Sequence, residues 1–134
     1  MRWWALIASL SMVLPTFPSG AQEPLTPIEA QVVLYRAGWE QEAARDAYSV
    51  ACGTMSHRDW GESACKPGVT GILGHQGLFQ IDPDWKWLCG DVDLYQPTEN
   101  ARCARLIREY EEELGLPDYT HWDVKPGVAM EVRP

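Results

Sequence analysis

Four cysteines, Cys52, Cys65, Cys89 and Cys103, constrain the fold of this chain more than any other feature. An even number of cysteines in a short exported chain is typical of disulfides, although the sequence alone leaves the pairing open. Because short loops close most readily, we expect Cys52 to pair with Cys65 and Cys89 to pair with Cys103. A zinc site is the alternative, but the chain has no Cys-x-x-Cys pair and its three histidines are scattered. The sequence therefore predicts two disulfides and no metal site.

The N-terminal segment has the pattern of an export signal. A positive head is followed by the uncharged run Trp3 to Leu14 and by small residues that end at Ala21. This run is shorter than the ~20 residues that a membrane-spanning helix needs. We therefore expect residues 1–21 to be a signal peptide and residues 22–134 to form a single secreted domain, in the bacterial periplasm or outside the cell.

The expected mature chain is strongly acidic. Without the signal segment it has 10 basic and 19 acidic residues, a formal net charge of −9. Nucleic acids and anionic membranes are polyanions, so we exclude both as partners of the mature chain. Carbohydrate recognition rests on stacking and hydrogen bonds, and this charge does not oppose it.

Helical patterns dominate the mature chain, so we expect a mainly helical fold. Thr26-Pro27 opens a helix that runs to about Ala37, with Ile28, Val32 and Tyr35 at helical spacing. A second helix is expected from Trp39 to Cys52. The clearest helix is predicted from Glu99 to Leu114, ended by Gly115.

The remaining segments have weaker patterns. Ser56 to Asp59 predict a capping box at the start of a short helix. Glycines between Lys66 and Gly77 indicate an irregular loop or short β structure. Residues 82–96 are expected to be loop with one turn of helix, and the tail from about residue 124 is expected to be irregular.

One stretch combines a carboxylate with a glycine-rich loop. Glu62-Ser63 and Lys66-Pro67 precede the run Gly74-x-x-Gly77-Leu78-Phe79-Gln80-Ile81, and Gly77 follows Glu62 by 15 positions. Together with Asn100 at the start of a later helix, this pattern resembles the signature of lytic transglycosylases and goose-type lysozymes. The resemblance covers roughly residues 44–122.

The resemblance implies a lysozyme-like α+β fold, with a short β or irregular region beside a glycan groove. It also implies cleavage of the β-1,4 bond between N-acetylmuramic acid and N-acetylglucosamine in peptidoglycan, with Glu62 as general acid and then base. The substrate-binding residues that it implies are Ser63, Gly77, Leu78, Phe79, Gln80, Asn100, Tyr119 and Trp122.

Such chemistry requires a carboxyl group that stays protonated near neutral pH. Burial beside apolar groups raises the pKa of a carboxyl, and we expect Trp60, Leu78 and Phe79 to supply that environment for Glu62. In the transglycosylase route the ionised Glu62 then takes the proton of the sugar's own 6-hydroxyl, which gives a 1,6-anhydro product. This route needs one carboxylate and no cofactor.

The sequence leaves two other functions open. A muramidase-type hydrolase would use a second carboxylate, for which Asp82, Asp84, Asp91 and Asp93 are available, although turns and caps also explain them. A non-catalytic protein that binds peptidoglycan or takes part in assembly is the other, with Glu62 as a solvated charge. Protein partners and oligomeric state are not indicated.

Individual polar and aromatic residues have alternatives too. Gln80 either binds an N-acetyl group or hydrogen-bonds the loop that shapes the groove. Trp85, Trp87 and Trp122 offer flat faces for sugar rings, but tryptophans also fill cores.

The chain departs from the family pattern at two places. Residues 53–61 separate the predicted second helix from Glu62, and no Ala-Tyr-Asn-Ala-Gly-like stretch supplies a groove tyrosine. Tyr119 or Trp122 could replace that tyrosine. A Cys52–Cys65 disulfide would tie together both sides of the extra residues before the acid.

Overall fold

The computed structural model describes residues 23–53 and 62–123 of the chain. Its helices are α2 (Pro27–Arg36), α3 (Gln41–Cys52), α4 (Lys86–Cys89), α5 (Pro97–Glu113) and α6 (Thr120–Asp123), with the 3-10 turn η1 (Pro83–Trp85) before α4. In these two ranges β structure is limited to isolated bridges that pair Gln76 with Thr70 and with Ile81. The predicted mainly helical fold is confirmed, and its finer lysozyme-like architecture stays a prediction.

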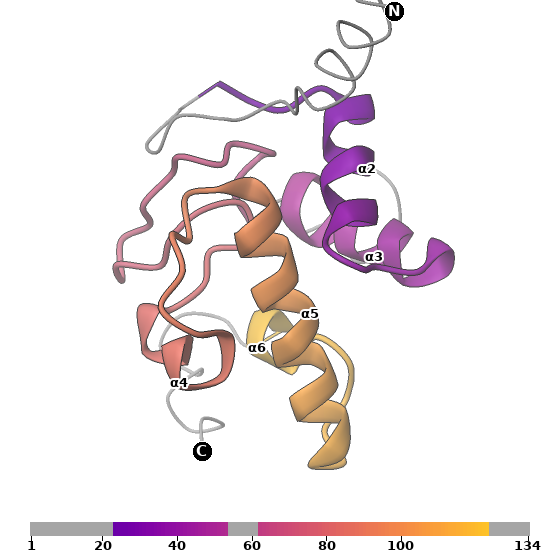
Figure 1. Cartoon of the computed structure of the whole chain (residues 1–134), viewed down its shortest axis with the longest axis vertical. Helices are drawn as coiled ribbons and strands as arrows, with labels where there is room; N and C mark the ends of the chain where they lie inside the picture. The colour runs from indigo at the N-terminus through magenta and orange to yellow at the C-terminus, as the bar shows by residue number, and fades with distance from the viewer. Residues whose placement is uncertain (1–22, 54–61, 124–134) are drawn as a thin grey trace, which may run out of the picture.

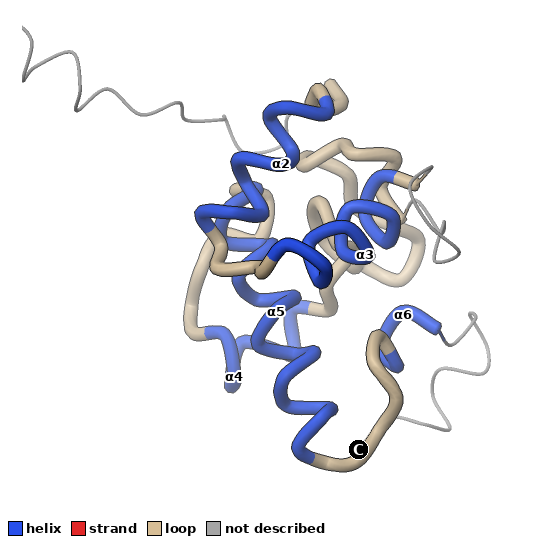
Figure 2. The backbone as a smooth tube through the Cα atoms, turned by 90° about the vertical axis from the view of Figure 1, so that its right-hand side faces the viewer, coloured by secondary structure: helices blue, strands red, loops and turns tan. Residues whose placement is uncertain are grey.

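Helix α5 is the element on which the others are assembled. Helices α2, α4 and α6 all pack against it, and α2 also packs against α3, as the two views in Figures 1 and 2 show. Its buried side is made of small and branched residues, among them Ala101, Ala104 and Ile107, none of which is exposed. Small side chains on this side allow neighbouring helices to approach closely.

Helix α2 begins at the predicted cap, Thr26, which forms a capping box with Glu29. The Thr26 hydroxyl accepts a hydrogen bond from the Glu29 amide at 3.2 Å, and the Glu29 carboxylate accepts one from the Thr26 amide at 2.9 Å. This capping box satisfies backbone donors that the first turn leaves without helical partners, and Pro27 needs none. Gly38, with φ of +92°, allows the chain to turn after the helix.

An aromatic cluster joins the connection between α2 and α3 to the glycine-rich segment and to the residue before α6. The indole of Trp39 stacks with the rings of Phe79 and Tyr119, with centroids 6.1 and 6.3 Å away. Its Nε1 donates a hydrogen bond to the carbonyl of Ala101 at 2.9 Å. Trp39 therefore belongs to the core and precedes α3, which is why this helix begins at Gln41 and not at Trp39 as predicted.

Both predicted disulfides are present. Cys52 is bonded to Cys65, and Cys89 is bonded to Cys103, which links α4 to α5. Disulfides are typical of proteins that mature in an oxidising compartment. In residues 23–53 and 62–123, no helix is long and apolar enough to cross a membrane.

Other boundaries differ by small amounts from the prediction. Helix α5 begins at Pro97, two residues before Glu99, because proline fits the first turn of a helix. The loop predicted over residues 82–96 contains both η1 and α4. The signal peptide, the capping box at Ser56 to Asp59 and the tail from residue 124 lie outside the described residues.

Candidate functional site

The glycine-rich segment forms a loop that is braced by one glutamine side chain. Residues Gln76 and Ile81 exchange backbone hydrogen bonds of 2.8 and 2.9 Å, which closes a tight turn. Inside it, the Gln80 amide group donates to the carbonyls of Val69 at 3.0 Å and Gly77 at 2.9 Å. The sequence left two roles open for Gln80, binding of an N-acetyl group or hydrogen bonding within the loop. The structure shows the hydrogen bonds within the loop.

Asn100 fastens this loop to the first turn of α5. Its Oδ1 accepts a hydrogen bond from the amide of Phe79 at 2.8 Å, and its Nδ2 donates to Gln76 and Leu94 carbonyls at 2.8 and 2.7 Å. The side chain is fully buried, and these contacts use both of its amide hydrogens. The structure therefore places Asn100 behind the loop, where it holds the loop in position.

The predicted acid lies at the end of α3. The Glu62 amide donates to the carbonyl of Val50 at 2.8 Å, and the Ser63 amide donates to the carbonyl of Ala51 at 3.2 Å. The Glu62 side chain is exposed, so the apolar enclosure expected around the carboxyl is not seen among the described residues. Trp60, one of the three residues expected to provide it, lies outside them.

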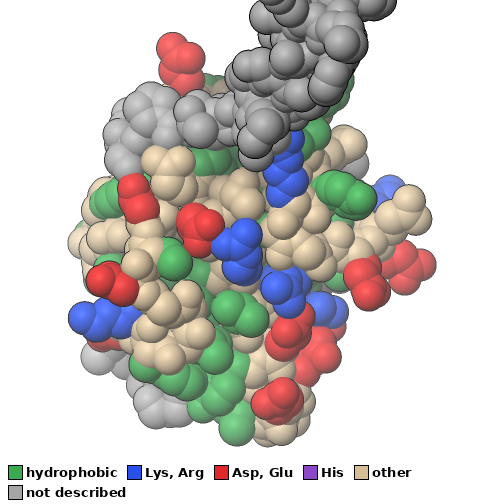
Figure 3. Space-filling model, in the orientation of Figure 1, with side chains coloured by type: hydrophobic (Ala, Val, Ile, Leu, Met, Phe, Trp, Pro, Cys, Tyr) green, Lys and Arg blue, Asp and Glu red, His purple; other side chains and the backbone are tan. Residues whose placement is uncertain are grey.

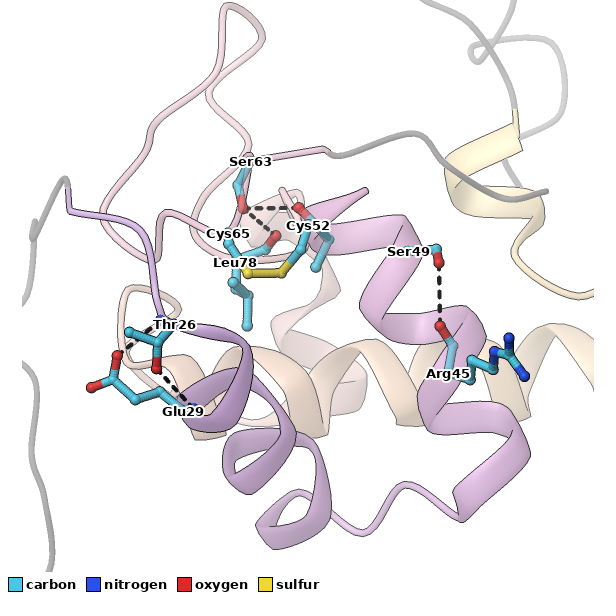
Figure 4. Close-up of a disulfide and its surroundings, with 9 residues drawn as sticks. Thr26, Glu29, Arg45, Ser49, Cys52, Ser63, Cys65 and Leu78 are labelled. Atoms are coloured by element: carbon cyan, nitrogen blue, oxygen red, sulfur yellow. Dashed lines mark hydrogen bonds between the residues drawn. A yellow bond between two sulfur atoms is a disulfide. The ribbon is translucent and has the colours of Figure 1, made fainter. Parts of the chain in front are cut away.

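Ser63 joins the acid to the glycine-rich loop. Its hydroxyl is buried and lies 2.7 Å from the carbonyl of Leu78 and 3.3 Å from that of Ala51, as Figure 4 shows. One hydroxyl hydrogen cannot serve both carbonyls equally, and the shorter contact is the stronger bond. The end of α3 and the loop therefore share a fixed contact at the residue next to Glu62.

The apolar members of the motif lie in the core. Leu78 and Phe79 are 1% and 0% exposed, and the Phe79 carbonyl accepts a hydrogen bond of 2.7 Å from Nε1 of Trp122. Tyr119 is also buried, and its hydroxyl donates to the carbonyl of Ala43 at 3.2 Å. These four side chains hold the loop against the helices.

Left-handed backbone conformations gather in the same segments. Among the described residues other than glycine, positive φ occurs at Ala64, Cys65, Gln80 and Tyr119. Such conformations are unfavourable for residues with a side chain and persist only where the surroundings enforce them. Ala64 and Cys65 directly follow Glu62-Ser63, and Gln80 lies in the glycine-rich loop, which we also call the motif loop. Such a concentration of left-handed residues is often found at functional sites.

A cluster of half-exposed aromatic rings lies around η1 and α4. The rings of Trp85 and Trp87 stack with centroids 5.7 Å apart, and each meets the ring of Tyr110 edge-on at 5.9 and 5.1 Å. Trp87 is 62% exposed. Hydrophobic side chains gather over α4 and the neighbouring part of α5 in Figure 3. We call Trp85, Trp87 and Tyr110 the aromatic platform.

Two of the four aspartates considered as second carboxylates, Asp82 and Asp93, have structural contacts. Asp82 Oδ1 accepts a hydrogen bond from the Asp84 amide at 3.0 Å, and Asp82 Oδ2 lies 3.8 Å from Nε2 of His75. Asp93 accepts from the Tyr95 amide at 3.0 Å. Both therefore have the turn and cap roles that aspartates commonly adopt.

One titratable residue of interest was missed by the sequence analysis. Glu111, in α5, is only 5% exposed, and burial raises its pKa to about 7, while a hydrogen bond from the His121 backbone amide opposes the rise. The amide lies 3.3 Å from Glu111 Oε1. Other glutamates surround Glu111 in the sequence, so nothing in its immediate neighbourhood predicts burial. The one available indication was its position on the side of α5 that also carries Ala104 and Ile107.

The structure thus joins Ser63, the neighbour of Glu62, to the Gly77 to Gln80 loop, and Asn100, Tyr119 and Trp122 lie in the core behind it. In the described part of the chain, no group of three or more His, Cys, Asp or Glu side chains could hold a metal ion. Models of known protein families, curated proteins and solved structures were compared with this chain, and none of them matches it.

Proposed function

We propose that this chain is a peptidoglycan lytic transglycosylase that cleaves the β-1,4 bond between N-acetylmuramic acid and N-acetylglucosamine. The observation that carries the proposal is the contact of Ser63 with the Leu78 carbonyl at 2.7 Å. Through it, the residue beside the exposed Glu62 is hydrogen-bonded to the glycine-rich loop. A general acid needs this kind of fixed presentation next to a surface that can bind substrate.

In the proposed reaction the Glu62 carboxyl donates its proton to the glycosidic oxygen as the bond to the muramic C1 breaks. The carboxylate that remains then accepts the proton of the muramic 6-hydroxyl, whose oxygen bonds to C1. The products are a 1,6-anhydro end and a new free 4-hydroxyl, and Glu62 is again protonated. Water is not consumed.

Substrate binding completes the environment of the acid in this proposal. Glu62 is exposed without a glycan, and a bound sugar chain would remove water from the carboxyl. Loss of water disfavours the ionised form and raises the pKa of a carboxyl. The aromatic platform would provide faces on which sugar rings stack, since flat apolar rings suit the hydrophobic faces of pyranoses.

The proposal is tested by mass spectrometry of sacculi digested with the exported protein. We expect soluble fragments with 1,6-anhydro ends, and none from the Glu62→Gln variant. Fragments with reducing ends would show that the protein is a muramidase-type hydrolase.

A non-catalytic function is the second candidate, favoured by exposed apolar side chains on α2. Ile28 and Tyr35 on α2 are 74% and 79% exposed. Beside them, Leu34, Trp39 and Tyr48 help to line a cleft of about 260 Å³ between α2 and α3. Sacculus binding without release of fragments, unchanged in Glu62→Gln, would identify a wall-binding or assembly protein.

A further inference from the structure

The hydrogen bonding of α3 continues beyond the last residue of the helix. The Ser49 carbonyl accepts from the amide of Gly53, four residues later, as in any α-helix. The next two carbonyls, of Val50 and Ala51, accept from the amides of Glu62 and Ser63. In an uninterrupted helix, residues 54 and 55 would make these two bonds.

Glu62 and Ser63 therefore occupy the places of residues 54 and 55 of an extended α3. The sequence between these places, residues 54–61, is an insertion of eight residues into the end of the helix. Gly53 has φ of +82° and ψ of +171°, a conformation that takes the chain out of the helix. The acid is attached to α3 by hydrogen bonds, although it is distant from the helix in sequence.

The Cys52–Cys65 disulfide closes this interruption. Cys52 is the last residue of α3, and Cys65 follows Ser63 by two positions. The Cys65 amide also lies 3.3 Å from the Ala51 carbonyl, and its own carbonyl accepts a hydrogen bond of 2.8 Å from the Leu25 amide. A covalent bond thus joins the helix end to the segment that carries the acid, as peptide bonds would in a continuous helix (Figure 4).

We propose that Cys52 and Cys65 are positioning residues for the Glu62 carboxyl. The role in catalysis rests on the function proposed above, but the placement itself does not. The disulfide holds Glu62 and Ser63 on the carbonyls of Val50 and Ala51. Without it, no covalent bond would join the end of α3 to the segment that carries the acid, and the backbone hydrogen bonds of Glu62 and Ser63 could open more often.

The second disulfide supplies a matched control. Cys89–Cys103 spans 14 positions and Cys52–Cys65 spans 13, so removal of either should loosen the unfolded chain to a similar extent. We expect the melting temperatures of the C52S/C65S and C89S/C103S variants to be lower than that of the wild type by similar amounts. At a temperature where both are folded, only C52S/C65S should lose kcat, by at least about tenfold, with KM nearly unchanged.

A structural readout separates this proposal from the proposed function. Amide hydrogen exchange of Glu62 and Ser63, measured by NMR, should be at least about tenfold faster in C52S/C65S than in the wild type and unchanged in C89S/C103S. Unchanged exchange at both amides in C52S/C65S would overturn the proposal even if the protein cleaves no glycan.

Discussion

Gly77 lies directly against Asn100. A methyl group on its α-carbon would come within 2.3 Å of Asn100 Nδ2 and 2.1 Å of the Leu94 carbonyl oxygen, and its φ is +79°. Both distances are far below van der Waals contact, so a side chain at this position would push the motif loop away from α5. The glycine in the motif is therefore required by the packing of the loop on the helix.

The Gly77→Ala substitution should destabilise the fold strongly. We expect a loss of at least about 3 kcal/mol in the free energy of unfolding, from the clash and the left-handed backbone together. Gly74→Ala is the matched control, because Gly74 has φ of +81° but no atom near its missing side chain. It should cost about 1 kcal/mol in urea unfolding. Equal losses in the two variants would show that the close approach to Asn100 is unimportant.

Asn100 should be essential for holding the motif loop against α5. Asn100→Ala removes the partners of the Phe79 amide and of the Gln76 and Leu94 carbonyls, at a cost of about 3 kcal/mol in stability. Asn100→Asp keeps the shape and the acceptor but replaces the donor with a second oxygen that faces both carbonyls. We expect it to be at least as unstable in urea unfolding. Wild-type stability of the Asp variant would contradict the buried hydrogen-bond network.

The stability of the protein should fall as the pH rises from about 4.5 to 7. Burial raises the pKa of Glu111 from its ordinary value of 4.5 to about 7 in the folded state, so in this interval the folded state holds a proton that the unfolded state has lost. The shift corresponds to about 3 kcal/mol, and the loss should level off above pH 7. Urea unfolding at several pH values measures it.

Glu111→Gln should remove this pH dependence, because the neutral side chain can still accept the hydrogen bond of the His121 amide. The variant should be more stable than the wild type at pH 8. The exposed neighbour Glu113 provides the control, since Glu113→Gln should leave the dependence in place. If the stability of Glu111→Gln still falls between pH 4.5 and 7, another titrating group causes the pH dependence.

Trp87 should contribute to glycan binding more than to folding. Because its side chain is 62% exposed, Trp87→Ala should change the melting temperature little, while KM for glycan strands rises about fivefold from the lost stacking. Tyr35→Ala removes another exposed aromatic ring, on α2, and should leave KM unchanged. Equal effects of the two substitutions on KM would exclude the aromatic platform as a sugar-binding surface.

Local sequence signals predicted most of the helices and both disulfides. Thr26-Pro27 and Gly115 mark helix ends by chemistry that acts within one turn, and short loops favoured the observed cysteine pairs. The spacing of Ile28, Val32 and Tyr35 correctly indicated a helix, but α2 buries Ala30, Val33 and Leu34 instead. Periodicity identifies a helix, while the buried side depends on the neighbouring elements.

The roles of the motif residues depended on contacts between distant segments. Asn100 and Trp122 contact the loop from 21 and 43 positions away, so the sequence suggested their importance but not that they support the loop from behind. The placement of Glu62 on the carbonyl of Val50 could not be predicted either, because the eight residues between Gly53 and Glu62 obscure the continuity of the helix. Glu111 was missed because its charge favours exposure and only packing buries it.

The central claim, that Glu62 is the acid of a glycan-cleaving site, is tested most directly by the release of soluble fragments from purified sacculi. The wild-type protein, Glu62→Gln and the surface control Glu113→Gln are compared at equal concentration, once their melting temperatures have been shown to agree. We predict that the wild type and Glu113→Gln release fragments at the same rate, and that Glu62→Gln is slower by at least about a hundredfold. Release by Glu62→Gln at the wild-type rate would contradict the account.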